Sequence, residues 1–306
     1  MDRLIAILMQ DHPALAEDEI VRLLDMEAYQ RQGRYLFFTQ GSDLWKRLAY
    51  THAVHRIIYE SSVQTFLSHP FQPAATHTLE ILKDKHDKRL RSSAIRAAFR
   101  NRTTDEGTMD YAVIILEDRA ILTERIWQNP KEYLQRRPHL RPAHHPASIH
   151  PKLARALVNL SGVQEGTIYD PLCGVGGIAI EAGLMGLTVK CSDIDQTMIR
   201  KCRMNLKSYG IDATPDLIDA LKTQQQTDAV VTELPFCRTT KRISDIDGFY
   251  GDFLAHIAGL CHDAVVVFPD SAPIRRLIER SPWELEVSHS YYIHRSLSKI
   301  IVVLRR

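Results

Sequence analysis

The sequence predicts an α/β protein in two parts: a mixed α+β region followed by a doubly wound, largely parallel sheet. Two observations lead to this prediction. Strand-like and helix-like segments alternate from residue 151 onward, and a proline-rich stretch separates them from an N-terminal half without that regularity. With 306 residues, the chain is long enough to bury two separate cores.

The C-terminal half shows a regular order of elements. Apolar residues at helical spacing predict a helix over residues 152–160, and further helices are expected at 178–185 and 196–209. Short apolar runs predict strands at 167–169, 188–192, 229–232, 264–268 and 300–304. The stretch 291–304 fits a closing antiparallel hairpin. Strands that alternate with helices of this length indicate a parallel sheet.

The boundary between the two parts is predicted from prolines. Five of them lie between residues 129 and 151: Pro130, Pro138, Pro142, Pro146 and Pro151. This density disfavours both a helix and a central strand, so an extended connector is expected. The predicted division is an N-terminal region over residues 1–135, a linker over 136–150 and a C-terminal domain over 151–306.

The N-terminal half is harder to interpret. Its pattern predicts strands at residues 4–9, 35–39 and 113–116, and helices at 16–25 and 43–55. Together they indicate a mixed α+β region. Its fold does not follow from the pattern alone.

Composition excludes several classes of protein. A hydrophobic content of 44% and a charged content of 25% are ordinary for a globular protein. The longest apolar runs are too short to cross a bilayer, and the N-terminus does not resemble a secretory leader, so no membrane association is expected. The net charge of +2 does not by itself indicate a nucleic-acid partner.

No metal site is expected from the spacing of cysteine and histidine. The five cysteines contain no CxxC pair: Cys173, Cys191, Cys202, Cys237 and Cys261. This argues against a zinc site and a disulfide framework, and it favours a reducing cytoplasm. The histidines of the connector are irregularly spaced: His139, His144, His145 and His150.

A glycine-rich turn at residues 170–177 predicts a nucleotide-like cofactor. Gly174 and Gly176 lie between a predicted strand and a predicted helix, where glycine permits a sharp bend and close approach of a ligand. Asp193 follows Gly174 by 19 residues and ends the next strand, in the position of a carboxylate that binds ribose hydroxyls. Asp195 is expected instead to cap the following helix.

Asp170, at the end of the first strand of this half, favours S-adenosylmethionine over a dinucleotide. A carboxylate there would repel a pyrophosphate, whereas it suits a methionine amino group and a sulfonium cation. The glycine spacing also matches the dinucleotide pattern only in part.

The segment Glu233-Leu234-Pro235-Phe236 follows the predicted strand 229–232 and resembles the motif of methyltransferases that act on exocyclic amines. In that motif an acceptor side chain and a backbone carbonyl hold the amine, while an aromatic ring stacks on the extruded base. The motif usually begins with Asp or Asn. Glu233 keeps the acceptor chemistry but adds a methylene, which leaves three alternatives: an active enzyme with an adjusted loop, activity on another base, or an inactive protein.

The whole chain resembles the archaeal and eukaryotic tRNA guanosine-10 methyltransferase family, in which a THUMP domain precedes a Rossmann-like, class I methyltransferase domain. Residues 141–142, 145–160, 170–183 and 293–297 have the strongest resemblance, and the N-terminal half matches weakly. The resemblance implies that Asp170, Gly174, Gly176, Asp193 and Asp219 contact S-adenosylmethionine, and that Glu233, Pro235 and Phe236 hold the guanine. It also implies tRNA as substrate and a possible small activator subunit as partner.

Two basic clusters are expected to contact RNA phosphates. Residues 83–102 hold eight basic residues against two acidic ones, a local charge of +6. The first cluster is represented by Lys83, Lys85, Lys88, Arg89 and Arg91. The second cluster, in the connector, consists of Arg136, Arg137 and Arg141.

Three other interpretations remain open from sequence alone. A non-catalytic RNA-binding paralogue would have kept the fold and lost the acceptor geometry at Glu233. Because Cys237 follows the motif directly, a C5-pyrimidine methylase is a second alternative. A nicotinamide-dependent dehydrogenase is the third, and Asp170 disfavours it.

Overall fold

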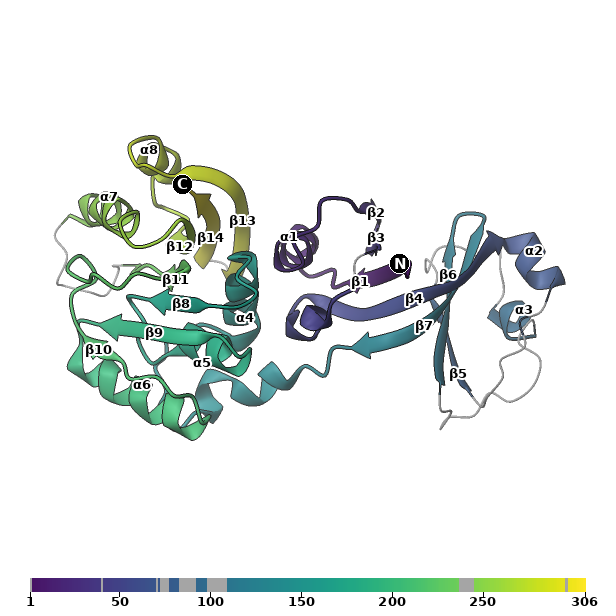
Figure 1. Cartoon of the computed structure of the whole chain (residues 1–306), viewed down its shortest axis with the longest axis horizontal. Coiled ribbons are helices and arrows are strands. Elements are labelled where there is room, and N and C mark those ends of the chain that lie inside the picture. Colours follow the sequence, from purple (N-terminus) through teal and green to yellow (C-terminus); the bar gives the residue numbers. More distant parts are fainter. Residues whose placement is uncertain are drawn as a thin grey trace. The chain divides into compact units, whose positions relative to one another are not determined.

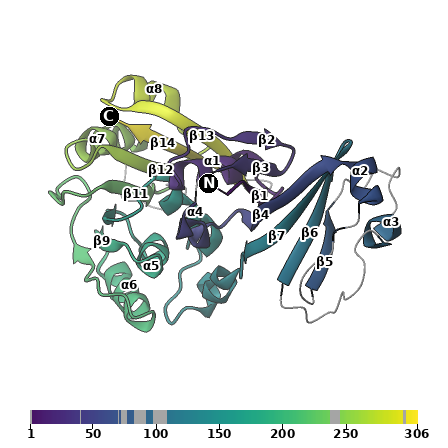
Figure 2. The same cartoon turned by 45° about the vertical axis from the view of Figure 1, so that its right-hand side comes forward.

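The computed structural model describes residues 2–39, 41–69, 71, 77–82, 92–97, 109–236, 245–294 and 297–306. The chain divides into two compact units, shown in Figures 1 and 2. The first comprises Met1–Gln10, Met26–Asp43 and Thr51–Asn129, and the second comprises Asp11–Asp25, Leu44–Tyr50 and Pro130–Arg306. Two N-terminal segments therefore belong to the second unit, which the predicted division at residue 135 does not foresee.

The first unit is built on a seven-stranded sheet with the order β2-β3-β1-β4-β7-β6-β5. The strands are β1 (Leu4–Leu8), β2 (Gln30–Gln32), β3 (Tyr35–Phe38), β4 (Thr51–Ser62), β5 (His77–Leu82), β6 (Met109–Leu116) and β7 (Arg119–Gln128). Two short helices accompany them, α2 (Val63–Ser68) and α3 (Ser92–Ala97). The predicted strands at 4–9, 35–39 and 113–116 are confirmed.

The predicted helix over residues 43–55 is wrong beyond its first turn. A short 3-10 helix, η1, spans Asp43–Arg47, and the long strand β4 begins at Thr51. Strand β4 pairs with β1 on one side and β7 on the other, so long-range pairing determines its conformation. The connector also contains two short 3-10 helices, η2 (Glu132–Arg136) and η3 (Pro138–Leu140), where an extended chain was expected. Pro138 starts η3, a position at which its fixed φ is compatible with a helix.

The second unit contains the predicted doubly wound sheet, with the order β10-β9-β8-β11-β12-β14-β13. Its strands are β8 (Thr167–Asp170), β9 (Thr188–Asp193), β10 (Asp216–Leu217), β11 (Ala229–Glu233), β12 (Asp263–Pro269), β13 (Glu284–His294) and β14 (Leu297–Arg305). The first five are parallel to one another, and β14 is antiparallel to both β12 and β13. The Rossmann-like α/β prediction and the closing hairpin are therefore confirmed.

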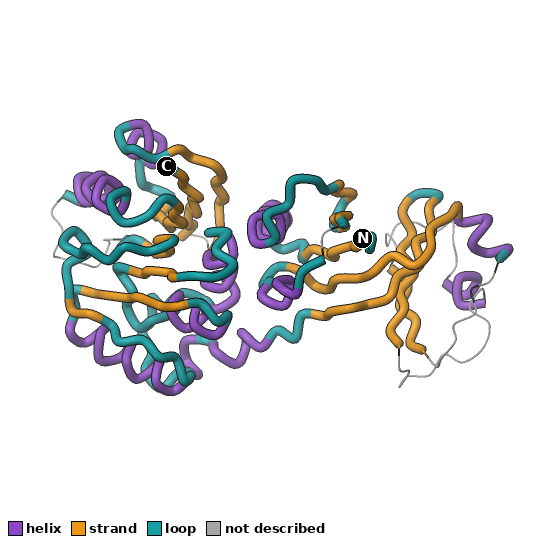
Figure 3. The backbone as a smooth tube through the Cα atoms, viewed as in Figure 1, coloured by secondary structure: helices purple, strands orange, loops and turns teal. Residues whose placement is uncertain are grey.

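Helices cover both faces of this sheet. They are α4 (Pro151–Leu160), α5 (Gly177–Leu184), α6 (Gln196–Ser208), α7 (Ile246–Ile257) and α8 (Ile274–Glu279). Figures 1 and 2 show α5 and α6 on the opposite side of the sheet from α7 and α8. Phe253 of α7 and Leu277 of α8 belong to one buried cluster with Val230 and Val266 of the sheet. Figure 3 shows the alternation of strands and helices along this unit.

Glu19 connects the segment Asp11–Asp25, which includes helix α1 (Pro13–Leu23), to the rest of the second unit through hydrogen bonds. The Glu19 carboxylate is fully buried and accepts hydrogen bonds of 2.7 Å from the backbone N–H groups of Ala49 and Tyr50. The side-chain amide of Asn159 in α4 donates a third, also of 2.7 Å. Three donors offset part of the cost of burying this carboxylate, although burial still raises its pKa, and the bonds join both N-terminal segments to α4.

The strand order positions the ligand site. The connection reverses direction between β8 and β11, which lie side by side in the sheet. Ligands of doubly wound sheets bind outside the carboxyl ends of the strands at such a point. Asp170, Asp193 and Glu233 are the last residues of β8, β9 and β11, so all three lie at this edge.

Candidate cofactor and acceptor site

Asp170 is the most deeply buried acidic group at this edge, with 3% of its surface exposed. Its Oδ1 accepts hydrogen bonds from the Thr232 hydroxyl at 2.6 Å and the Leu172 N–H at 3.2 Å. These bonds favour the ionised form, but burial outweighs them and raises the pKa of Asp170 to about 8. A buried carboxyl without a cationic partner among the described residues suits a ligand that brings its own positive charge.

The turn after Asp170 requires its glycines. Gly174 and Gly176 have φ values of +52° and +88°, in the left-handed region that other residues seldom adopt. Gly176 is also the N-cap of α5, and a Cβ there would lie 2.8 Å from the Cys202 sulfur. Both the backbone conformation and the close packing therefore exclude a larger residue at position 176.

Gly176→Ala is expected to lower the midpoint of thermal unfolding and to weaken cofactor binding. Alanine would incur the cost of a positive φ, about 1–2 kcal/mol, and would also clash with Cys202. Gly210→Ala is the matched control, because Gly210 has φ +66° but open space around its Cβ position. Equal destabilisation of the two variants would show that the contact with Cys202 has no effect.

Asp193 joins the glycine turn to the loop after β9. Its Oδ2 accepts from the Gly174 N–H and its Oδ1 from the Asp195 N–H, both at 2.9 Å. Burial raises the pKa of Asp193, and these two backbone donors oppose that shift. Each oxygen keeps a further lone pair for a ribose hydroxyl. The predicted capping role of Asp195 is confirmed by the 2.7 Å hydrogen bond that its side chain accepts from the Thr197 N–H.

Asp219 follows β10, the strand next to β9, and its side chain is 32% exposed. Its Oδ1 accepts from the Leu221 N–H at 3.0 Å, which fixes the carboxylate at the same edge of the sheet. The structure thus brings the predicted cofactor residues to one edge. Their chemistry fits S-adenosylmethionine. The glycines allow the ligand to approach the backbone closely, Asp193 offers acceptors for ribose hydroxyls, and Asp170 offers a carboxylate for the positive charge of the methionine part.

Glu233 ends β11 and is paired with a residue that the sequence reasoning did not identify. Its Oε1 lies 2.5 Å from the Nζ of Lys299, the third residue of β14. Burial raises the pKa of Glu233, and the charge and hydrogen bond of Lys299 oppose that shift. The Lys299 Nζ also lies 5.4 Å from the centre of the Phe236 ring. A lone lysine ahead of the apolar run 300–304 was the only sequence signal for this role.

The peptide around Pro235 is held by α7. The Tyr250 hydroxyl donates a 2.7 Å hydrogen bond to the Pro235 carbonyl, and its buried ring packs edge-on against Phe268 of β12. Glu233, Pro235 and Phe236 are therefore placed by three separate elements, β11, α7 and β14. Phe236 is the last described residue before the gap at 237–244, and Cys237 lies outside the described residues.

The residues predicted to contact RNA differ in exposure, and some of them lie outside the described ranges. Lys83, Lys85, Lys88, Arg89 and Arg91 lie outside the described residues. Arg136 makes two 2.8 Å hydrogen bonds to the buried carboxylate of Glu181, and Arg141 is 4% exposed. Arg137 is the exposed member of the connector cluster. RNA contact by these arginines stays a prediction.

Within the described part of the chain, no helix combines the length and apolar character needed to cross a membrane.

Comparison with known proteins identifies the family. Residues 138–299 match the RMKL-like methyltransferase domain. A tRNA (guanine(10)-N2)-dimethyltransferase of Methanothermobacter thermautotrophicus is 31% identical over 335 residues, which cover 99% of each chain. The protein of the same name from Methanocaldococcus jannaschii is 27% identical over 355 residues, covering 98% of this chain and 99% of the relative.

Solved structures support the fold. TrmN from Thermus thermophilus superposes with a TM-score of 0.55 at 16% identity, covering 99% of both chains. SMU.472, solved in complex with SAH, has a TM-score of 0.52 at 14% identity and covers 99% of this chain and 97% of that one. The dehydrogenase interpretation is wrong, because the whole-chain relative of 31% identity and the matched domain are methyltransferases. The chain belongs to the tRNA (guanine(10)-N2)-dimethyltransferase family, with its RMKL-like methyltransferase domain at residues 138–299.

Proposed function

We propose that this protein transfers methyl groups from S-adenosylmethionine to the exocyclic amine of guanine in tRNA, at position 10 as in the names of its relatives. The main support is that the residues proposed to bind the cofactor lie directly beside those proposed to bind the base. The Thr232 hydroxyl donates to Asp170 on the cofactor side, and the next residue is Glu233 on the acceptor side. A methyl donor held near Asp170 and an amine held by Glu233 would therefore meet at one point of the sheet edge.

The carboxylate of Glu233 favours guanine over other bases. An ionised carboxylate only accepts hydrogen bonds, and the edge of guanine presents adjacent donors in its N1–H and its amino group. Adenine places an acceptor beside its amine, which the carboxylate would repel. The second oxygen of Glu233 is free of Lys299, because the ion pair uses Oε1. The acceptor side is thus suited to a base edge with donors only.

The reaction needs the amine to leave the plane of the base. S-adenosylmethionine supplies a methyl group on a cationic sulfur, which needs no further activation. Glu233 accepts an N–H of the amine, directs its lone pair toward the methyl group and is positioned to take the proton that leaves. Phe236 provides a stacking surface for the extruded base, and Tyr250 fixes the peptide carbonyl of Pro235 beside it. Lys299 favours the ionised form of Glu233 against the effect of burial, so it acts as a positioning residue.

The N-terminal region is proposed to hold a THUMP-like RNA-binding domain. Its place upstream of the catalytic domain, with the basic cluster in residues 83–102, supports this role. Arg137 would add an exposed cation in the connector. A cytoplasmic location and a possible small activator subunit are part of the same proposal. The division into residues 1–135, 136–150 and 151–306 is proposed for the order of the domains along the chain, with Asp11–Asp25 and Leu44–Tyr50 packed in the second unit.

Methyl transfer is expected when the purified full chain is incubated with tritiated S-adenosylmethionine and unmodified tRNA transcripts. Nucleoside analysis should place the label in N2-methylguanosine or its dimethyl form. Transcripts with adenine at position 10 serve as the control and should stay unlabelled. Label in another nucleoside would refute the proposed base, whereas equal labelling of the control would refute the position.

A second candidate is a non-catalytic RNA-binding protein, because Glu233 is already engaged by Lys299. This alternative predicts weak or absent binding of S-adenosylmethionine. Calorimetric titration of the cofactor distinguishes the two: micromolar binding without any labelled nucleoside would indicate a missing partner or another RNA, and absence of binding would favour the second candidate.

A further inference from the structure

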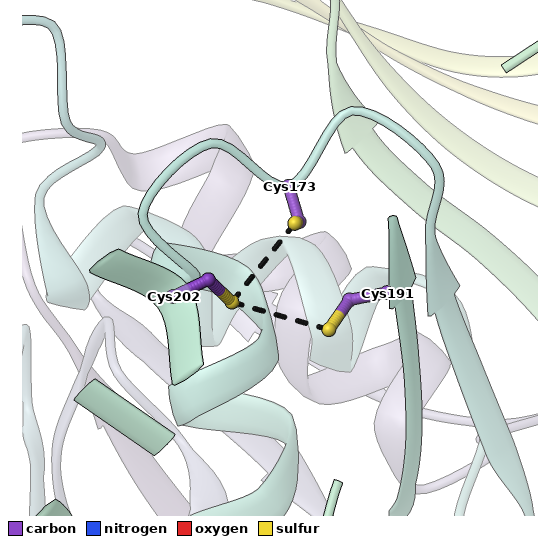
Figure 4. A group of neighbouring side chains, drawn as sticks. All are labelled: Cys173, Cys191 and Cys202. Carbon is purple, nitrogen blue, oxygen red and sulfur yellow. Dashed lines mark hydrogen bonds between the residues drawn. The ribbon is translucent and has the colours of Figure 1, made fainter. Parts of the chain in front are cut away.

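Three cysteines from three different elements meet beside the cofactor turn (Figure 4). Cys173 lies in the turn, Cys191 in β9 and Cys202 in α6. The Cys202 sulfur is 3.9 Å from that of Cys173 and 4.0 Å from that of Cys191, and all three sulfurs lie within 4.8 Å of one another. All are buried, with at most 5% of their surface exposed. The sequence spacing did not predict this cluster, because the three residues become neighbours only through the sheet.

The spacing of the sulfurs fits a single metal ion. In the plane of the three sulfurs, the point equidistant from them lies about 2.3–2.5 Å from each, close to the Zn–S length of about 2.3 Å. Thiolates are soft ligands that prefer zinc and similar ions over the hard cations Mg²⁺ and Ca²⁺. No other arrangement of three His, Cys, Asp or Glu side chains with this proximity occurs among the described residues.

We propose that Cys173, Cys191 and Cys202 form a binding site for one thiophilic divalent cation, zinc above others. In tetrahedral coordination the sulfurs would draw together to about 3.8 Å from one another, and the Gly174 carbonyl oxygen, 3.8 Å from the Cys173 sulfur, is the nearby candidate for the fourth ligand. The three cysteines are distinct from the acceptor residues Glu233 and Lys299, which lie on β11 and β14.

The ion would hold the cofactor turn in its binding conformation. Cys173 stands between Leu172, whose N–H binds Asp170, and Gly174, whose N–H binds Asp193. Its own N–H donates to the Ser192 carbonyl at 2.8 Å. A metal ion shared with Cys191 of β9 and Cys202 of α6 would link the turn to both elements. It would thus fix the backbone between Asp170 and Asp193. This consequence, unlike metal binding itself, rests on the proposed function.

The test titrates Cd²⁺ and Zn²⁺ into the reduced, metal-free full chain. We expect one equivalent of Cd²⁺ to produce a thiolate-to-metal absorption band, and Zn²⁺ to displace it and raise the melting temperature. Cys202→Ser should weaken Zn²⁺ binding about 100-fold or more, measured against a chromophoric chelator. Cys261→Ser is the matched control, since Cys261 is another buried free cysteine of the same unit, and it should bind as the unmodified protein does.

A second variant makes the test independent of folding defects in Cys202→Ser. Cys173→Ser changes a turn residue and should lose Zn²⁺ binding while keeping the native circular dichroism spectrum. The proposal is overturned if the reduced protein binds Cd²⁺ no more tightly than Cys173→Ser, or if Cys261→Ser loses as much affinity as Cys202→Ser. Loss of Zn²⁺ binding with unchanged binding of S-adenosylmethionine would refute the coupling to the turn and leave the metal site standing.

Discussion

Asp170→Asn is expected to weaken binding of S-adenosylmethionine strongly and, at the same time, to raise the melting temperature of the cofactor-free protein. Asparagine keeps the carbonyl oxygen that accepts from Thr232 and Leu172. It cannot ionise, so it cannot supply the negative charge that would pair with the cationic cofactor. The binding constant should fall about 100-fold or more, since loss of a buried charge pair costs several kcal/mol.

The gain in stability follows from the raised pKa of Asp170. Its ordinary pKa is 3.8, and burial raises it to about 8 in the folded protein. The folded state therefore holds a proton that the unfolded state has released at any pH between these values. The resulting stability is complete below about pH 4 and is lost as the pH rises through 8, at about 1.4 kcal/mol per pKa unit. The neutral asparagine escapes this loss, so the gain of the variant should be largest at pH 8 and above.

Melting curves of both proteins between pH 5 and 9, together with calorimetric titration of the cofactor, measure both effects. Asp195→Asn is the control, because asparagine caps a helix as well as aspartate does. Neither its stability nor its cofactor affinity should change. A variant at 170 that is less stable than the unmodified protein at pH 9 would show that the buried carboxylate stabilises the fold and would contradict the assignment.

The fold of the second unit could be predicted because its signals are local. Each strand and helix there shows the spacing of apolar residues that is typical of its type. The glycine turn, Asp170 and Asp193 lie at the ends of strands that this spacing predicts. The first unit could not be predicted in the same way. Strand β4 was mistaken for part of a helix because its conformation depends on pairing with β1 and β7.

The same distinction between local signals and long-range pairing applies to the residues of the candidate site. Glu233, Pro235 and Phe236 form one continuous motif, which the sequence displays directly. Lys299 is 66 positions away from Glu233 and meets it only because β14 inserts antiparallel beside β12. The cysteine cluster is a second case, since neither the interval from Cys173 to Cys191 nor that from Cys191 to Cys202 resembles a metal-binding motif. Contacts made across a sheet leave no regular spacing in the sequence.

Glu233→Gln is expected to lower kcat for methyl transfer about 100- to 1,000-fold without changing the affinity for S-adenosylmethionine. Glutamine keeps one acceptor oxygen but introduces an NH₂ group, which would face the donor groups of guanine and cannot take a proton. Lys299→Met should lower kcat less, because Glu233 remains. Without the lysine, burial alone acts on the carboxyl group and raises its pKa further.

The pH profile separates these two roles. Because Lys299 holds down the pKa of Glu233, its loss should move the acid limb of the kcat profile to higher pH, and activity should recover in alkaline buffer. Glu233→Gln should show no such recovery. Lys207→Met, at an exposed position of α6, is the control and should keep the normal profile. An unshifted acid limb in Lys299→Met would contradict the assignment of Lys299 as a positioning residue.

The ion pair between Glu233 and Lys299 also explains why position 233 is a glutamate and not the aspartate that is usual in this motif. The 2.5 Å contact between Glu233 and Lys299 depends on the full length of the glutamate side chain. Glu233→Asp would shorten it by a methylene, draw the carboxylate out of reach of Lys299 and leave the lysine buried without its partner. The variant should therefore be less active than the unmodified protein, about 10-fold or more in kcat. If aspartate instead increased the activity, Glu233 would be a defect of the acceptor site, and Lys299 would serve only the packing of β14.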